Sequence, residues 1–424
     1  MRLFLAALIP WLAIAEIRTV TLKEAVAMAL RQSPDLLLAR LDEQKAQLAI
    51  RVAKDPFRPK VYGGSGLAYS SGFPMSIEGS APSIFQARGI SSVYNKSHGY
   101  RIAQSVEQAR GAAIDTQIRR DEVVYQTALY YLEAARWARA ATNARQQIDA
   151  LERAAEVVKL RVQEGRELEL AARQAALSAA KARQRLRTIE QDQDQAEALL
   201  ANLMGLGPDD RLRATTDTAA GLAPPDSEIA AVTSALDQNR ELRKLESSIL
   251  AKELEGKQHL ATRLPTVDLV AQYGLFARFN NYEDFFQKFQ RHNGQLGVSV
   301  QVPLFLSAAA KAQAGQAEAE ATRLKTQILQ TRNRIALDTR RSHQQWKLNE
   351  QAREVARLDL DVAREQVNVT LAKFEEGRAS IQELEQARFQ EQEKWIAYYD
   401  SQYAVERAKL DILKHTGGLL ASLQ

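Results

Sequence analysis

The side chains that could carry chemistry lie in spacings that fit no familiar catalytic or metal-binding pattern. The five histidines form neither an HExxH motif nor a His-x₃₋₅-His pair, so their spacing predicts no zinc site. The segment 256–258 reads Gly-Lys-Gln and lacks both the earlier glycine and the hydroxyl of a phosphate-binding loop. No Gly-x-Ser-x-Gly turn and no kinase-type signature occurs. The sequence therefore predicts no enzyme, and it indicates no catalytic residue, cofactor or metal.

Length and composition narrow the classes further. The chain has 424 residues, of which 45% are hydrophobic and 26% charged, and it contains no cysteine. The lack of cysteine excludes a disulfide framework, a thiol nucleophile, a Cys-ligated zinc site and a lipid-modified N-terminal cysteine. The net charge of +5 comes from 57 basic and 52 acidic residues that are interleaved along the chain. Nucleic acid is therefore not expected as a partner.

The first fifteen residues predict an export signal. Arg2 supplies the basic start, residues 3–14 form the apolar stretch, and Ala13 and Ala15 fit the small-residue cleavage rule. A buried N-terminal helix is the alternative. No later window contains the roughly 18 uninterrupted apolar residues that a membrane helix needs. We expect an exported protein without a helical membrane span.

The rest of the chain contains two copies of one pattern. The segments 29–36 and 235–242 both open with Ala-Leu and close with Leu, and they lie 206 positions apart. Pro59 and Pro265 are separated by the same interval, which indicates an internal duplication. The expected organisation is a signal peptide at 1–15, a first structural repeat at 16–205, a linker or equatorial segment at 206–226, a second structural repeat at 227–418 and a C-terminal tail at 419–424.

Each repeat contains two β-like stretches. Strands are predicted at about 60–73 and 83–94 in the first repeat, and at about 266–279 and 295–305 in the second. Alternation of apolar and polar residues over about ten positions is long enough for a tilted membrane strand, although a half-buried strand of a soluble sheet is the alternative. Four strands cannot close a barrel, and lipid does not tolerate an open sheet edge. Copies of the chain would therefore have to share one barrel.

Long segments without proline predict two helical rods, at about 98–164 and 306–376, followed by return helices at 167–204 and 379–415. At 1.5 Å per residue each rod would be roughly 100 Å long. A narrow apolar seam runs along each rod with steps of three and four residues, a pattern typical of helices packed side by side around a hollow, with a plain coiled coil as the alternative. The seams consist of Ile148, Leu151, Ala155, Val158 and Val162, and of Leu360, Ala363, Val367, Leu371 and Phe374.

Each rod ends at the triplet Glu-Gly-Arg, and the two triplets lie 212 positions apart. A glycine can adopt the left-handed conformation that lets a helix stop and the chain reverse. The exposed tips would be either simple turns or elements for docking or gating. They consist of Glu164, Gly165 and Arg166, and of Glu376, Gly377 and Arg378.

Taken in this order, the doubled Ala-Leu openings, the proline-led strands, the segment Val-Gln-Val-Pro-Leu-Phe at 300–305 and the doubled tips resemble the TolC family of outer-membrane efflux proteins over nearly the whole mature length. The resemblance implies a mainly α fold with a small β part. Long α-helical hairpins would form a periplasmic α-barrel, and each chain would contribute four strands to a trimeric, twelve-stranded transmembrane β-barrel.

The resemblance also implies a function and partners. The protein would be a homotrimer embedded in outer-membrane lipid, with its helical part in the periplasm. It would serve as the passive exit duct of a tripartite efflux or export system. A periplasmic adaptor, or membrane fusion protein, would couple it to an inner-membrane pump of the resistance-nodulation-division or ABC type. The alternatives are the exit duct of a type I protein secretion system, or an exported coiled-coil structural protein without a channel. Drugs, metals and polypeptides all remain open as cargo.

Particular residues take roles from the same resemblance. The two Glu-Gly-Arg tips match the segments where adaptors dock. Glu383 lies six residues after Gly377, as a periplasmic gate carboxylate does in members of the family, and Gln386 stands where a second acid is usual. Ala171 stands opposite an acid in the first repeat. The acidic ring would then be thinner, or formed instead by Glu167, Glu169 and Glu385.

Overall fold

The computed structural model describes residues 18–66, 83–207, 210–215, 222–276, 292–305 and 307–423, so the predicted signal peptide at 1–15 lies outside the described residues. The chain divides into two compact units, and each unit draws residues from both sequence repeats. The first unit comprises residues 1–39, 117–240 and 331–424, and the second comprises residues 40–116 and 241–330.

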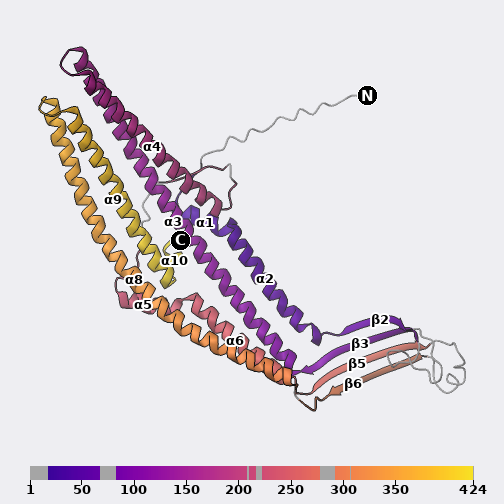
Figure 1. Cartoon of the computed structure of the whole chain (residues 1–424). Coiled ribbons are helices and arrows are strands. Elements are labelled where there is room, and N and C mark those ends of the chain that lie inside the picture. The colour runs from indigo at the N-terminus through magenta and orange to yellow at the C-terminus, as the bar shows by residue number, and fades with distance from the viewer. Residues whose placement is uncertain are drawn as a thin grey trace, which may run out of the picture. The chain divides into compact units, whose positions relative to one another are not determined.

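The elements follow one another as two similar series (Figure 1). The first series comprises β1 Arg18–Val20, α1 Leu22–Gln32, α2 Pro34–Lys54, η1 Asp55–Phe57, β2 Lys60–Gly66, β3 Ser83–Asn95, α3 Lys96–Gln163 and α4 Glu169–Leu203. The second comprises β4 Leu212–Ala214, α5 Glu228–Gln238, α6 Arg240–Ala261, β5 Thr266–Phe276, β6 His292–Gln301, α8 Ala308–Glu375, α9 Ile381–Thr416 and α10 Leu419–Leu423.

The two longest helices, α3 and α8, each contain 68 residues. Neither contains proline, so the backbone hydrogen-bond ladder is never broken by a missing N–H. Helix α3 begins at Lys96, two residues before the predicted start at 98, and α8 begins at Ala308, two residues after the predicted start at 306. The return helices α4 and α9 likewise begin and end within two residues of their predicted positions. Differences of this size are ordinary at helix ends, which fray.

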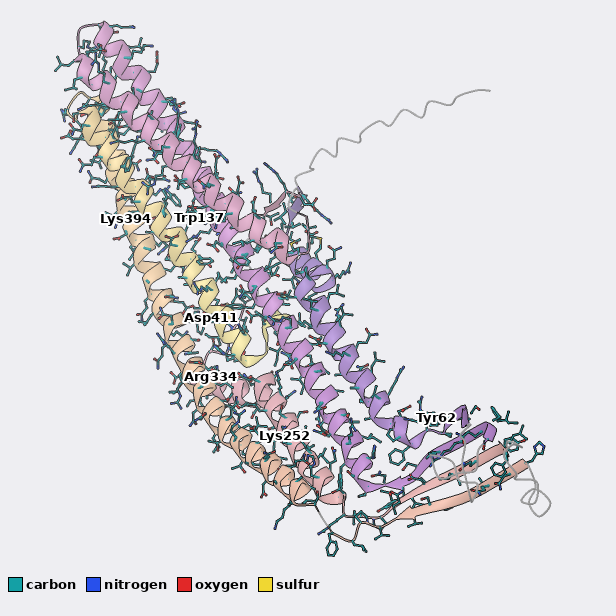
Figure 2. All side chains as sticks on the ribbon, turned by 45° about the vertical axis from the view of Figure 1, so that its right-hand side comes forward. Tyr62, Trp137, Lys252, Arg334, Lys394 and Asp411 are labelled. Carbon is teal, nitrogen blue, oxygen red and sulfur yellow. The ribbon has the colours of Figure 1, made fainter. Side chains whose placement is uncertain are left out.

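In the first unit each return helix runs back beside its long helix, α4 along α3 and α9 along α8 (Figure 1). Ion pairs join the partners: Arg183 Nε donates to Glu152 at 2.9 Å between α4 and α3, and Lys394 Nζ lies 2.7 Å from Asp359 between α9 and α8 (Figure 2). The residues of the predicted seams are buried or half-buried here. Most of the stabilisation of each helix pair comes from burial of these narrow apolar seams. The exposed ion pairs contribute little.

The main core of the first unit surrounds a two-stranded parallel sheet, β1 with β4, in which Arg18 pairs with Leu212. Tyr131 of α3 is buried there, and its hydroxyl contacts Thr215 at 2.7 Å. Residues 206–226 were expected as a linker or equatorial segment, and β4, with only three residues, gave no pattern from which to predict this sheet. Residues 419–423 form α10 rather than a tail, because Leu419 and Leu423 are buried in the same core.

The second unit contains a four-stranded antiparallel sheet in the order β2-β3-β5-β6 (Figure 1). The central pair β3–β5 joins a strand of the first repeat to a strand of the second, with Ile90 opposite Val270. Strands β2 and β6 form the two outer edges.

The strand ends differ from the sequence prediction. β6 spans 292–301 instead of 295–305, and residues 302–305 are not in a strand. Pro303 has no N–H to donate to a ladder, which explains the early end. β3 spans 83–95 against the predicted 83–94. The predicted strand residues 67–73 and 277–279 lie outside the described residues.

The helices of the second unit pack through small and polar side chains. A Cβ on Gly256 of α6 would meet the Cβ of Ala317 of α8 at 3.7 Å, so the two helices approach closely here. Ser247 Oγ of α6 donates to the carbonyl oxygen of Glu107 of α3 at 2.8 Å. Every helix in the described part of the chain is too polar, or too short, to span a lipid bilayer.

A matched pair of glycines tests the repeated architecture. Gly205 ends α4 with φ 72°, and a Cβ there would lie 2.5 Å from the carbonyl oxygen of Gln32. Gly417 ends α9 with φ 73°, and a Cβ there would lie 3.3 Å from the flexible Oε1 of Gln238. Both alanine variants incur about 1–2 kcal/mol for the left-handed backbone. Only Gly205→Ala also collides with backbone.

We therefore predict that Gly205→Ala lowers the midpoint of thermal unfolding more than Gly417→Ala does. Circular dichroism melting of the two variants and the wild-type protein measures the difference. Equal shifts would show that Gln32 can move away from position 205 at little cost.

Candidate functional site

The two hairpin tips are built alike. Gly165 and Gly377 adopt φ values of 73° and 74°, in the left-handed region. A Cβ at either position would have no neighbour within 4 Å. Any other residue at these positions would be disfavoured by the positive φ and not by a clash with a neighbour. The tips are exposed turns in which glycine is required by the reversal of the chain.

The backbone hydrogen bonds at the two tips also correspond. The N–H of Arg166 donates to the carbonyl oxygen of Arg161 at 2.8 Å, and the N–H of Gly165 donates to Val162 at 2.9 Å. At the second tip the equivalent bonds are 2.7 Å to Lys373 and 3.1 Å to Phe374. This pattern is a Schellman motif, which satisfies the last carbonyls of a helix.

The charged residues of the tips face solvent. Arg166 lies 3.4 Å from Glu164, and Arg378 lies 3.3 Å from Glu376. Ion pairs this exposed contribute at most about 1 kcal/mol, so these side chains can exchange partners at little cost. Each tip thus presents one cation and one anion beside exposed backbone.

A small apolar cluster lies below the tips and joins all four helices of the first unit's hairpins. Val158 of α3, Phe374 of α8 and Leu384 of α9 are at its centre, and each is almost fully buried. The Arg161 guanidinium lies 4.7 Å from the ring centroid of Phe374 and covers one side. The cluster holds the two tips at one end of the first unit.

The tips differ in how their return helices begin. Helix α9 starts with a capping box in which the N–H of Glu383 donates to Ser380 Oγ at 3.2 Å and the N–H of Ser380 donates to Glu383 Oε2 at 2.8 Å. Leu168 occupies the equivalent position before α4, with no side-chain cap and 75% of its surface exposed. The first tip is therefore more apolar, and fewer of the backbone N–H groups at the start of α4 have a hydrogen-bond partner than at the start of α9.

The structure places the predicted gate residues at the start of α9. Glu383 is exposed, and its carboxylate closes the capping box. Gln386 lies three residues further along the helix and is also exposed. Within the residues described, no cluster of three or more histidine, aspartate or glutamate side chains could hold a metal ion. The pattern Ser-x-x-Glu at 380–383 is a recognised capping signal and would have predicted this local role.

The other acids considered for the gate differ in exposure and in hydrogen-bond partners. Glu169 is exposed and lies 3.7 Å from Arg173, while Glu167 is half-buried at the tip. Glu385 is half-buried and accepts a 2.6 Å hydrogen bond from Ser178 Oγ of α4. Burial raises the pKa of the Glu385 carboxyl above its usual value. The contact of Glu385 with Ser178 was not anticipated from the sequence, because nothing in the local pattern pairs α4 with α9.

The four-stranded sheet presents many large apolar side chains to its surroundings. Leu296 of β6 has 78% of its surface exposed, and Tyr62 projects from β2 (Figure 2). An antiparallel sheet of a soluble protein normally buries one face. The exposed apolar residues of the sheet are Val61, Tyr62, Ile84, Phe85, Val93, Tyr94, Leu269, Tyr273, Leu296, Val298 and Val300.

Duplicated helical hairpins, matched glycine tips and an exposed apolar sheet together resemble one class of protein, the outer-membrane channels with long helical extensions. Residues 231–418 match the family model described as outer membrane efflux protein, so the chain carries this domain through nearly all of its second repeat. The predicted resemblance to the TolC family is confirmed. Members of this family are outer-membrane channels and not enzymes, which agrees with the location and the lack of activity expected from the sequence.

Solved structures share the fold of the chain at low sequence identity. The CmeC outer membrane channel of Campylobacter jejuni aligns with a TM-score of 0.78 at 13% identity, covering 94% of this chain and 85% of that one. The outer membrane protein VceC of Vibrio cholerae gives 0.74 at 16% identity, covering 94% and 96%. The MtrE outer membrane channel of Neisseria gonorrhoeae, in its open state, gives 0.74 at 14% identity, covering 95% and 90%. A comparison with curated protein sequences finds no match.

The capping difference between the tips leads to a prediction. Ser380→Ala removes the cap of α9, which is worth about 1 kcal/mol, whereas Leu168→Ser supplies one to α4. Amide hydrogen exchange in the first turn of α9 should become faster in Ser380→Ala, and exchange in the first turn of α4 should become slower in Leu168→Ser. Unchanged exchange in both variants would mean that neighbouring contacts, not the caps, hold these turns.

Proposed function

We propose that the protein is the outer-membrane exit duct of a tripartite efflux or export system. It would act as a homotrimer and as a passive conduit, with an inner-membrane pump supplying the energy through a periplasmic adaptor. The observation that carries the proposal is the open, apolar sheet of the second unit.

The edges of this sheet argue for assembly with further copies of the chain. Within the described residues β2 and β6 each pair with one neighbour, so their outer backbone groups have no strand partner. Lipid offers no hydrogen bonds to such groups, and each unsatisfied one would cost several kcal/mol. Pairing β6 of one copy with β2 of the next satisfies both edges. Three copies then close a barrel of twelve strands, in the size range of known membrane barrels.

The exposed face of α8 supports the same assembly. Val355, Leu358 and Val362 recur at spacings of three and four residues, and all three are more than half exposed. A stripe of this kind on a long helix is expected to pack against another helix. In a trimer it would be covered by a neighbouring copy.

The tips support docking of an adaptor. Both present a glycine turn whose surroundings are open and whose charged side chains form only weak, exposed ion pairs. A partner can therefore approach the backbone closely and compete for those charges. In this proposal Glu383 and Gln386 contribute to a constriction near the same end.

The first prediction of this proposal concerns assembly and conductance. The mature protein, extracted from outer membranes with mild detergent, should have a native mass three times that of one chain after correction for bound detergent. The purified trimer should conduct ions in planar bilayers, either as isolated or after substitutions at the constriction. A monomer, or trimers that never conduct, would refute the exit duct.

The second prediction concerns the tips. Gly165→Val and Gly377→Val place a β-branched residue where φ is positive, which distorts the turn. Each should weaken adaptor binding and export several-fold while the trimer stays intact. Gly315→Val is the matched control, because Gly315 is an exposed glycine of α8 whose φ is not positive and whose Cβ would meet no neighbour. Export at the wild-type rate from both tip variants would rule out docking at these turns.

A further inference from the structure

Basic residues gather where the four-stranded sheet of the second unit meets its helices. The four segments at this junction are 50–60, 96–104, 256–265 and 307–314. They contain nine lysines and arginines but one carboxylate, that of Asp55, so their net charge of +8 exceeds the +5 of the whole chain. We call these nine cations the basic collar. They are Arg51, Lys54, Arg58, Lys60, Lys96, Arg101, Lys257, Arg263 and Lys311.

The topology of the sheet brings these segments together. Strands β2 and β5 begin, and β3 and β6 end, at the side of the sheet where the helices attach (Figure 1). Ser97 Oγ of α3 donates to the carbonyl oxygen of Gln258 of α6 at 3.0 Å, which joins two of the segments directly. Every strand has a collar cation near its helix-side end: Arg58 before β2, Lys96 after β3, Arg263 before β5 and Lys311 after β6.

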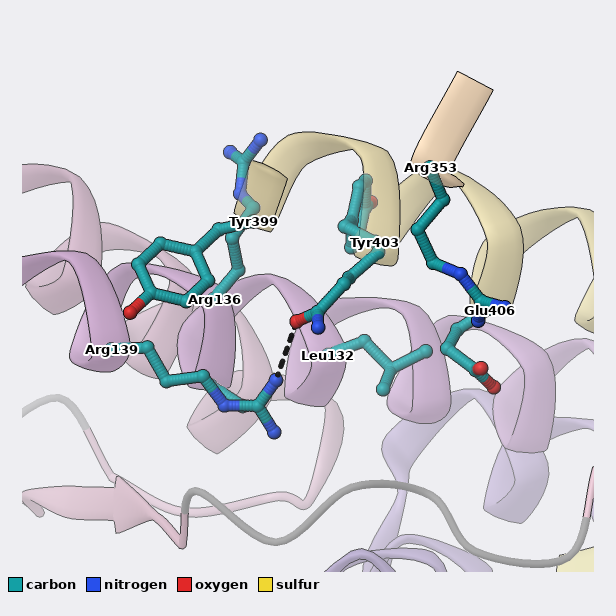
Figure 3. Close-up of a pocket in the computed structure, with 9 residues that line it drawn as sticks. Leu132, Arg136, Arg139, Arg353, Tyr399, Tyr403 and Glu406 are labelled. Carbon is teal, nitrogen blue, oxygen red and sulfur yellow. Dashed lines mark hydrogen bonds between the residues drawn. The ribbon is translucent and has the colours of Figure 1, made fainter. Parts of the chain in front are cut away.

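The collar cations are exposed, and almost none of them has a counter-charge. In the part of the chain that the structure describes, only Lys60 has a carboxylate within ion-pair distance, that of Asp55 at 2.6 Å. Other arginines are held by neighbours: in the first unit Arg136 lies 2.7 Å from Asp400, and Arg139 donates to Gln402 Oε1 at 3.3 Å (Figure 3). The collar is therefore a surface of uncompensated positive charge, which attracts anions.

The dipoles of the helices explain only part of the collar. A cation in the last turn of a helix is stabilised by the helix dipole, which accounts for Arg51 and Lys54 at the end of α2. Lys96 and Lys311 lie instead at the starts of α3 and α8, where the dipole favours anions. Neither of these helices has an acidic residue in its first turn. The two lysines are unfavourable for their helices unless an anion from elsewhere lies beside them.

The collar begins where the apolar face of the sheet ends. The register places Tyr94, Val267 and Val300 in one row across β3, β5 and β6. Leu269 lies on the same face, because it is two residues from Val267 along β5. Tyr94 is exposed at the end of this face, and Lys96 follows it two residues later. A tyrosine with a long basic side chain beside it is typical of a membrane interface, where the cation reaches the lipid headgroups.

We propose that the basic collar binds the headgroups of anionic phospholipids, in the membrane leaflet on the helix side of the sheet. The inference rests on the proposed function, because it needs the apolar face of the sheet to lie in lipid. Phosphate oxygens of the headgroups accept hydrogen bonds from the guanidinium and ammonium groups of the collar. The net charge of an anionic lipid adds an attraction that a zwitterionic lipid lacks. Bound lipids thus supply the anions that the starts of α3 and α8 do not have.

Retention of lipid by the full mature protein tests the proposal. The protein is reconstituted into vesicles of phosphatidylglycerol, which is anionic, and phosphatidylcholine, which has no net charge, in equal amounts. After extraction with mild detergent, the lipids that stay bound are identified and counted by mass spectrometry. The test variant removes three collar cations next to different strands: Arg58→Gln, Lys96→Gln and Arg263→Gln. The matched control removes three exposed cations of the first unit that also have no ion pair among the described residues: Arg187→Gln, Arg332→Gln and Arg341→Gln.

We expect wild-type protein to retain phosphatidylglycerol over phosphatidylcholine by about fivefold or more, the preference that one basic residue near an anionic surface gives. Raising sodium chloride from about 0.1 M to about 1 M should remove most of it, because the Debye length falls from about 10 Å to about 3 Å. The collar variant should lose most of the preference, and the control variant should keep it.

Equal retention of the two lipids by wild type, or an unchanged preference in the collar variant, would overturn the lipid proposal. The export duct would still stand in that case if the trimer inserts and conducts. A protein that inserts into neither lipid would overturn both proposals. If the collar variant fails to assemble, the wild-type lipid ratio at low and at high salt decides alone.

Discussion

Unpaired backbone groups at the edges of the four-stranded sheet are the constraint on which the rest of the arrangement depends. A strand edge can face water, but it cannot face lipid, because lipid offers nothing to bond. The sheet shows apolar side chains, as a lipid-facing surface would, and in the described residues β2 and β6 each have one open edge. Within the proposed function, assembly is therefore required for the sheet to be stable in a membrane. Closure of the shared barrel would set the number of strands, and the long helices extend from those strands.

Glycines with positive φ end the long helices and the return helices. Gly165 and Gly377 reverse the chain at the tips, and Gly205 and Gly417 stop the return helices. The second pair meets equivalent residues of the two repeats, Gln32 and Gln238. The duplication is thus preserved in which residue lies beside each glycine and not only in the order of elements, although Gly205 meets the backbone of Gln32 and Gly417 meets first the side chain of Gln238. The long helices between these points need little more than the absence of proline and a narrow apolar seam.

The sequence predicted the features that repeat or that follow a strong period. The long helices, the tips and the strand positions rest on such signals, and the resemblance to the TolC family follows from their order. Features set by contacts between distant segments escaped it. β4 is too short to show alternation, α10 is helical because Leu419 and Leu423 reach a core built elsewhere, and β6 stops before Pro303. The basic collar gathers four segments that lie far apart in the sequence, so no local pattern could indicate it.

The unequal tips have a consequence for symmetry. Three copies of a duplicated chain would present six hairpin ends in a ring that is sixfold in backbone but only threefold in chemistry. Ends with the exposed Leu168 would alternate around the ring with ends closed by Ser380. A partner that contacts only the glycine turn would have six equivalent binding sites, whereas one that also contacts the leucine would have three. In such a proposed assembly, the number of partner molecules bound would depend on the residue at a single position after each turn.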